Sequence, residues 1–96
     1  MRSSNDAPLA PEIRTMTVRV LFFGPLVDIT GTAALDLTLP DFSSVQHLLD
    51  ALSLRWPPLH DHDASLLTAV NLTYARRDEI IPHDSEVAVM PPVQGG

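Results

Sequence analysis

The stretch SSVQHLLDALSLRWPP, residues 43–58, is the part of the chain with a clear helical period. Its large apolar side chains recur at intervals of three and four, which places them on one face of an α-helix: Val45, Leu48, Leu49, Leu52 and Trp56. Ser43 followed by Gln46 predicts a capping box at the helix start, and Pro57-Pro58 ends the helix. One amphipathic helix cannot cover its own apolar face, so we expect it to pack on a sheet.

The segments on either side of this helix have the composition of strands. Residues 17–23 are β-branched and aromatic, and residues 34–39 alternate leucine with other residues. A short helical turn is expected between them. After the helix we expect a loop at residues 59–67 and then three strands, at residues 69–74, 80–81 and 86–90. This order predicts an α+β fold of the ubiquitin-like β-grasp kind, a mixed sheet with one main helix packed across it.

Alternation along the first and last strands predicts which side chains face the helix. The inward set is Val18, Val20, Phe22, Val87 and Val89. Phe23 and Met90 then face outward, and Tyr74 is a third candidate for the same surface. Because an exposed apolar patch usually marks an interface, we expect Phe23, Tyr74 and Met90 to bind a partner protein.

Composition restricts the possible functions. The net charge of −6 argues against a nucleic-acid partner. The chain has no cysteine, which excludes a disulfide, a thiolate metal site and a cysteine nucleophile. It also has no lysine, so Schiff-base chemistry is excluded. No apolar run has the length of a membrane span, and the start lacks a signal peptide's apolar core; we expect a cytoplasmic protein.

Several polar clusters have simpler explanations than a site. Residues 60–63, His-Asp-His-Asp, suggest a metal at first, but adjacent loop residues seldom converge on one ion, so we expect none. Arg76-Arg77 is expected to be a solvated turn, with binding of an anionic partner as the less favoured alternative. His47 and His83 are expected to be surface residues. Residues 71–73 match a glycosylation sequon within a predicted strand, which we discount.

The chain divides into three parts. Residues 1–15 are polar and without periodicity, which predicts a disordered N-terminal extension. Met16 is a candidate alternative start. Residues 16–90 then form the β-grasp domain, and residues 91–96 an extended tail, because consecutive prolines oppose both helix and sheet.

The tail ends in two residues without side chains. Six extended residues reach about 20 Å, which is far enough to enter a site on another protein. We expect five residues of the tail to insert into such a site on the partner protein: Pro91, Pro92, Val93, Gln94 and Gly95. The carboxylate of Gly96 is the distinctive reactive group, but it needs activation, and the chain has no Gly-rich phosphate loop. Activation is therefore expected on a partner enzyme.

The segment EVAVMPPVQGG, residues 86–96, resembles the C-terminus of the MoaD/ThiS family of sulfur carriers, in particular the branch that serves molybdopterin synthase. Residues 18–24 and 28–31 and the pair Val70-Asn71 resemble that family too. The resemblance implies that a ubiquitin-activating-like adenylyltransferase uses ATP to adenylate Gly96. A sulfur donor protein then supplies the sulfur of a thiocarboxylate.

The resemblance further implies that the tail inserts into the large subunit of molybdopterin synthase, in a heterotetramer. There the sulfur is donated to cyclic pyranopterin monophosphate in molybdenum cofactor biosynthesis. The chain would be a non-catalytic subunit that is active only with the large subunit and binds no cofactor. Two alternatives share the fold and the Gly-Gly end, a sulfur carrier of thiamine (thiazole) biosynthesis and a ubiquitin-like protein modifier. The Pro-Pro-Val sequence before the last residues favours the molybdopterin branch.

Overall fold

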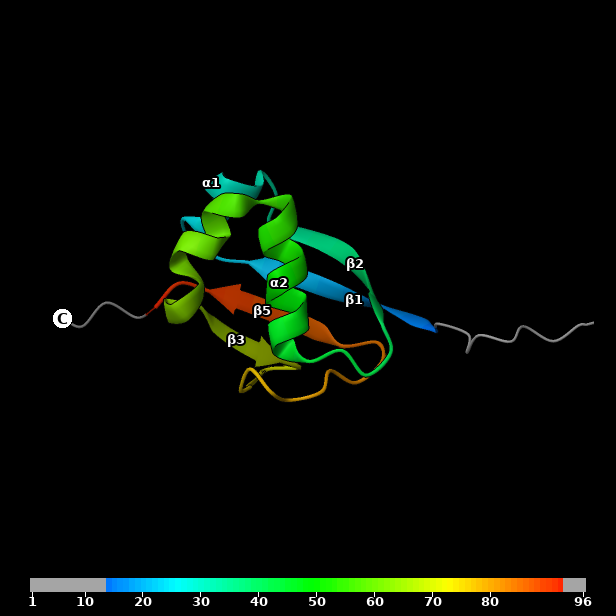
Figure 1. Ribbon diagram of the computed structural model, residues 1–96. Helices are drawn as coiled ribbons and strands as arrows, with labels where there is room; N and C mark the ends of the chain where they lie inside the picture. Colours follow the sequence, from blue (N-terminus) through cyan, green and yellow to red (C-terminus); the bar gives the residue numbers. More distant parts are fainter. Residues whose placement is uncertain (1–13, 93–96) are drawn as a thin grey trace, which may run out of the picture.

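The computed structural model describes residues 14–92, which form a sheet of five strands in the order β2-β1-β5-β3-β4. The helices lie on one face of this sheet (Figure 1). The elements in chain order are β1 (Thr15–Phe22), α1 (Leu26–Thr30), β2 (Ala34–Pro40), α2 (Val45–Arg55), the 3₁₀ helix η1 (Pro57–Ser65), β3 (Leu67–Val70), β4 (Thr73–Tyr74) and β5 (Glu86–Met90).

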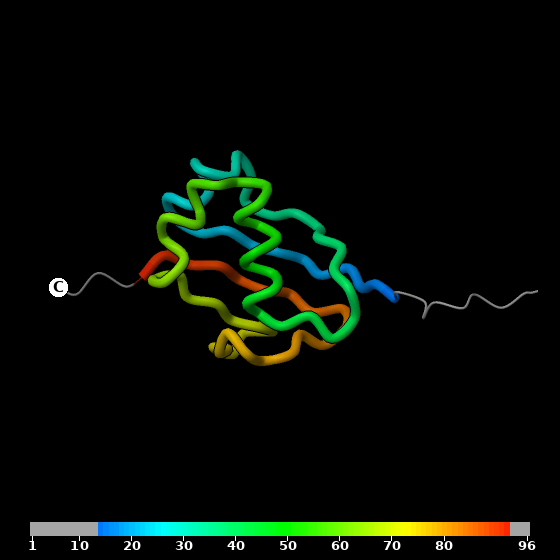
Figure 2. The backbone as a smooth tube through the Cα atoms, viewed as in Figure 1, coloured from blue at the N-terminus to red at the C-terminus, as the bar shows by residue number. Residues whose placement is uncertain are grey.

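The last strand lies in the centre of the sheet. β5 pairs in parallel with β1 and antiparallel with β3, while β1 pairs antiparallel with β2 on its other side. The first and last strands therefore run side by side, as the blue and red segments in Figure 2 show. This arrangement confirms the predicted mixed sheet with α2 across it and the β-grasp order of strands.

The core lies between the sheet and α2. Val18 and Val20 of β1 and Val87 and Val89 of β5 are fully buried. The helix contributes its predicted apolar face, which comprises Val45, Leu48, Leu49 and Leu52. Phe22 meets Trp56 edge to face, with ring centroids 5.9 Å apart. The predicted phase of both strands is confirmed.

The helix begins one residue later than expected. Ser44 is the N-cap, and its hydroxyl accepts a hydrogen bond from the His47 N–H at 3.2 Å, while the Ser44 N–H donates to His47 Nδ1 at 3.0 Å. The predicted box of Ser43 and Gln46 was wrong, because the Ser43 hydroxyl instead donates to the carbonyl of Pro40 at 2.6 Å.

Three segments after the helix differ from prediction. Residues 80–81, expected as a short edge strand, form only an isolated bridge, in which Ile80 pairs with Ser44. Residues 69–74 are not one strand but parts of a hairpin, in which Val70 of β3 pairs with Thr73 of β4. Asn71 and Leu72 between them have φ of 50° and 73°, which reverses the chain direction. Residues 59–67, expected as a loop, fall mostly in η1, and Leu59 is buried there.

The N-terminal boundary also shifts. Thr15, assigned by prediction to the extension, is the first residue of β1 and pairs with Pro40. The carbonyl of Arg14 accepts a hydrogen bond from the Asp41 N–H at 2.8 Å. The remainder of the predicted extension, residues 1–13, lies outside the described residues. Across residues 14–92, no helix combines the length and the apolarity needed to cross a membrane.

Candidate functional site

The site begins where β5 ends and the tail starts. Just past the end of β1, the Phe23 N–H donates to the carbonyl of Val89 at 3.3 Å, so this segment stays beside β5. Gly24 follows with a φ of 60°, a conformation that favours glycine. A Cβ atom at Gly24 would lie 3.5 Å from Pro91 Cγ, so the backbone of the turn is in close reach of the first tail residue.

The first two tail residues line a groove on the helix-bearing side. Pro91 and Pro92 form part of its wall, and the groove has a volume of about 220 Å³. The other lining residues come from two elements and the residues beside them: Pro25, Leu26 and Ile29 at α1, and His62, Ser65 and Leu66 at η1. The base of the tail is thus set against two helices. Predicted tail residues 93–96 lie outside the described residues.

The opposite face of the sheet carries no helix, and its end nearest the tail is apolar. By the strand registers the outward side chains there belong to Leu21, Leu67, Ala69, Tyr74, Ala88 and Met90, and Phe23 continues the alternation past β1. We call these seven residues the outer apolar patch. Phe23 is 46% exposed and Tyr74 69%. Farther from the tail the same face is charged, with Arg19 and Asp36 paired at 3.6 Å.

The three residues predicted to bind a partner all lie on this patch, although they are not all neighbours. Phe23 and Met90 are close to the tail, whereas Tyr74 is on β4 at the far edge, separated from β1 by β5 and β3. The sequence does not predict Leu67 and Ala69 on this surface, because residue 67 falls in the expected loop at residues 59–67 and the hairpin resembles a single strand at residues 69–74. The sequence also does not predict the groove between α1 and η1, which depends on elements distant in sequence.

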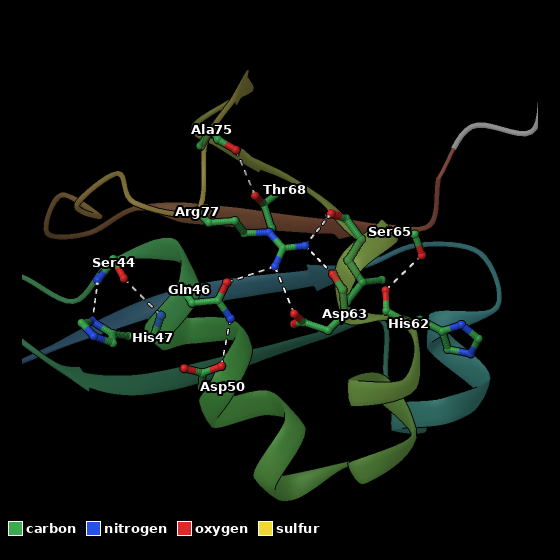
Figure 3. A network of polar contacts seen from close by, with 11 residues as sticks. Ser44, Gln46, His47, Asp50, His62, Asp63, Ser65, Thr68, Ala75 and Arg77 are labelled. Atoms are coloured by element: carbon green, nitrogen blue, oxygen red, sulfur yellow. Dashed lines mark hydrogen bonds and ion pairs between the residues drawn. The ribbon is translucent and has the colours of Figure 1, made fainter.

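A partly buried ion pair fixes the position of η1. The Arg77 guanidinium donates to Gln46 Oε1 at 3.1 Å, to Asp63 Oδ2 at 3.2 Å, and to the carbonyls of Asp63 and of Leu66, the latter at 3.1 Å (Figure 3). The side chains of Arg77 and Asp63 are only 31% and 25% exposed. Arg77 therefore joins the 76–79 turn to α2 and to the end of η1, where Leu66 also lines the tail groove.

This contact corrects the prediction of a solvated turn. Arg76 does face solvent, in a pair with Asp78 whose side chains are 78% and 73% exposed. Arg77, its neighbour, is instead half-buried. Asp63, one of the four residues considered for a metal, is bonded to Arg77. Among residues 14–92, no three histidine or acidic side chains gather as a metal site would require.

Asn71 has a structural role of its own. Its Oδ1 accepts a hydrogen bond from the Glu86 N–H at 2.9 Å, and its Nδ2 donates to Ser85 Oγ at 3.3 Å. The residue therefore joins the β3–β4 turn to the start of β5. Asn71 and Leu72 of the sequon lie in the turn, Thr73 begins β4, and the Asn71 side-chain amide is already hydrogen-bonded.

Known proteins resemble this chain over most of its length. The ThiS family model matches residues 20–96. The molybdopterin synthase sulfur carrier subunit of Arabidopsis thaliana is 33% identical over 82 residues, which is 85% of each chain. A putative molybdopterin converting factor, subunit 1, from Pyrococcus furiosus is 27% identical with a TM-score of 0.73, over 81% of this chain and 99% of that one. A chain in the structure of the complex between subunits 1 and 2 of the molybdopterin-converting factor from Helicobacter pylori is 22% identical, with a TM-score of 0.60. The match covers 84% of this chain and 100% of that one.

Proposed function

Since the chain belongs to the ThiS family, we propose that it is the sulfur carrier subunit of a molybdopterin synthase. The observation that carries this proposal is the identity of 33% to the Arabidopsis thaliana sulfur carrier subunit, over 85% of both chains. The geometry of the described residues supports it, because a rigid central strand leads directly into the tail. Delivery of a reactive end to a partner requires such a base.

The proposed chemistry takes place at the Gly96 carboxylate. A carboxylate resists nucleophiles because of its negative charge, so an adenylyltransferase first joins it to AMP, using ATP and releasing pyrophosphate. A donor that supplies sulfur at the oxidation level of sulfide then displaces AMP: the C–S bond forms as the C–O bond to AMP breaks, and Gly96 carries a thiocarboxylate. The role of this chain is to present the Gly96 carboxylate to its partners. Pro91, Pro92 and the groove between α1 and η1 set the direction in which the tail starts.

The proposed main partner is the large subunit of the synthase, with cyclic pyranopterin monophosphate as sulfur acceptor in a heterotetramer. Support comes from the Helicobacter pylori structure, which contains both subunits of a molybdopterin-converting factor. The surface we assign to this contact is the outer apolar patch together with the tail. Apolar side chains exposed around the exit of a tail favour burial against a second protein.

The test uses the end of the tail. The full chain is incubated with ATP, a sulfur donor and the adenylyltransferase, and then analysed by intact mass spectrometry. We expect the mass to rise by the difference between one sulfur and one oxygen, and the product to form molybdopterin with the large subunit. A variant with one alanine added after Gly96 should keep its mass and form none. Equal sulfur transfer by both proteins would refute the proposal, and an isopeptide link from Gly96 to a target lysine would favour the modifier instead.

Charged substitutions test the partner surface. Phe23→Asp and Met90→Asp each put a carboxylate into the apolar interface, so we expect affinity for the large subunit to fall about tenfold or more. Thr17→Asp is the matched control, because Thr17 is exposed on β1 two residues before Arg19, on the same face but away from the tail. Titration calorimetry measures the affinities, and circular dichroism checks the fold. Equal affinities for all three variants would exclude this surface as the interface.

A further inference from the structure

A second apolar surface lies on the helix-bearing side, away from the outer apolar patch. Phe42 and Leu54 are among the most exposed large apolar side chains of the described residues, at 79% and 86%. Both line one hollow of about 420 Å³, beside Leu39 and Ala51. Leu54 also lines an adjoining hollow of about 620 Å³ that extends to Pro57. We call the two hollows together the α2 groove, because they follow the flank of that helix.

Folding does not account for the aromatic ring at Phe42. Residues 40–43 form a turn that the Ser43 N–H closes on the carbonyl of Pro40 at 3.2 Å. Phe42 has a φ of 66° in this turn, a conformation that glycine adopts readily and a bulky residue does not. Its ring is largely exposed and contributes little to the core. The residue is therefore unfavourable for the turn and unnecessary for packing, which points to a role outside the folded domain.

The α2 groove is acidic. Three carboxylates line it, those of Asp41, Asp50 and Asp61, together with His47 and His60, and none of the arginines within residues 14–92 does. Asp41 lies 3.1 Å from His83 Nε2, whereas Asp50 accepts a hydrogen bond from the neutral amide of Gln46, with Nε2 at 2.9 Å. The nearby Arg55 guanidinium is stacked over the Trp56 ring, 4.5 Å from its centroid.

We propose that the α2 groove is a docking site for a basic amphipathic helix of a protein partner. The eleven residues of α2 span about 16 Å, which matches about three turns of a helix laid alongside. Apolar side chains of that helix would contact Phe42 and Leu54, and its lysines or arginines would face Asp50 and Asp61. A second copy of this chain is a poor occupant, since each copy has a net charge of −6 and no lysine.

The test uses a defined probe, a 14-residue peptide with leucines at helical spacing and lysines elsewhere. It is titrated into the ¹⁵N-labelled full chain and followed by NMR. We expect saturable shifts at amides around Phe42 and Leu54 and none on the outer apolar patch. Phe42→Gly and Leu54→Ser should each weaken binding about tenfold, as should Asp50→Lys, whereas Tyr74→Ser on the other face should not.

Phe42→Gly separates binding from folding. Glycine suits the turn, so this variant should unfold at the same temperature as the native chain or higher, and its loss of binding then reflects the missing ring. Four results of the peptide titration would overturn the proposal: no saturable binding, shifts confined to the outer apolar patch, equal binding of a peptide with glutamates in place of the lysines, or unchanged binding by both apolar variants. A dimer in solution that Leu54→Ser dissolves would overturn it in favour of self-association. None of these readouts depends on the chemistry of Gly96, so they also stand apart from the proposed function.

Discussion

Replacing Arg77 with alanine is expected to lower the free energy of unfolding by about 2–3 kcal/mol. Removing one partner of a fully buried pair costs about 3–5 kcal/mol, and a single hydrogen bond from a charged donor contributes about 1.5–3 kcal/mol. Arg77 donates to acceptors on Gln46, Asp63 and Leu66. The Arg77 and Asp63 side chains are 31% and 25% exposed, so water can partly solvate the Asp63 carboxylate once the guanidinium is removed. The loss in free energy of unfolding is therefore smaller than for a fully buried pair. For a domain of this size the melting temperature should fall by about 10–20 °C.

The neighbouring arginine supplies the control. Arg76 is paired with Asp78 at 3.1 Å, but both side chains are mostly exposed, so Arg76→Ala should cost only about 0–1 kcal/mol. Arg77→Lys should fall between the two, because an ammonium group cannot reproduce the planar fork of a guanidinium. Urea and thermal unfolding of the full chain, followed by circular dichroism, measure all three. If Arg77→Ala is as stable as Arg76→Ala to within about 0.5 kcal/mol, the assigned role of the pair is wrong.

Three further changes test local features of the fold. Leu72→Gly should raise the free energy of unfolding by about 0.5–1 kcal/mol, because the side chain is 93% exposed and its φ is 73°. Urea unfolding measures this gain, and a gain of the same size in Leu72→Ala would argue against relief of backbone strain. Ser44→Ala should lower it by about 1 kcal/mol through loss of the helix cap, and an unchanged thermal midpoint would contradict that. A chain that starts at Met16 lacks Thr15 and the hydrogen-bonded Arg14 carbonyl, so it should be less stable than one starting at Arg14 by about 1 kcal/mol; identical midpoints would show that this pairing contributes nothing.

The sheet and the main helix could be predicted because burial imposes a local period on the sequence. The five apolar positions from Val45 to Trp56 have the helical spacing, and the strand residues Val18, Val20 and Phe22 have the alternating one. The hairpin could not be predicted in this way. Asn71 and Leu72 lack the glycine that usually marks such a turn. The conformation there is stabilised because the Asn71 side chain donates a hydrogen bond to Ser85 Oγ and accepts one from the Glu86 N–H.

The different burial of Arg76 and Arg77 could not be predicted either, because it too depends on residues distant in sequence. Arg76 and Arg77 are identical in type and adjacent in sequence, yet one faces water and the other is half-buried. The difference comes from Gln46 and Asp63, which lie 31 and 14 residues away along the chain. No local pattern identifies partners at that distance. Phe23 and Met90 could be placed on the outer face because their exposure depends on strand phase alone.

The position of β5 has a mechanical consequence. A partner that grips the tail and pulls along it transmits the force to a strand bonded on both sides, to β1 from Arg19 to Phe22 and to β3 from Leu67 to Val70. The ladder hydrogen bonds lie across the direction of that force, so they are loaded in shear and must fail together. A hairpin at the edge of the sheet, such as β3–β4, could instead be peeled away one bond at a time. The tail can therefore be drawn taut without its base being extracted from the domain.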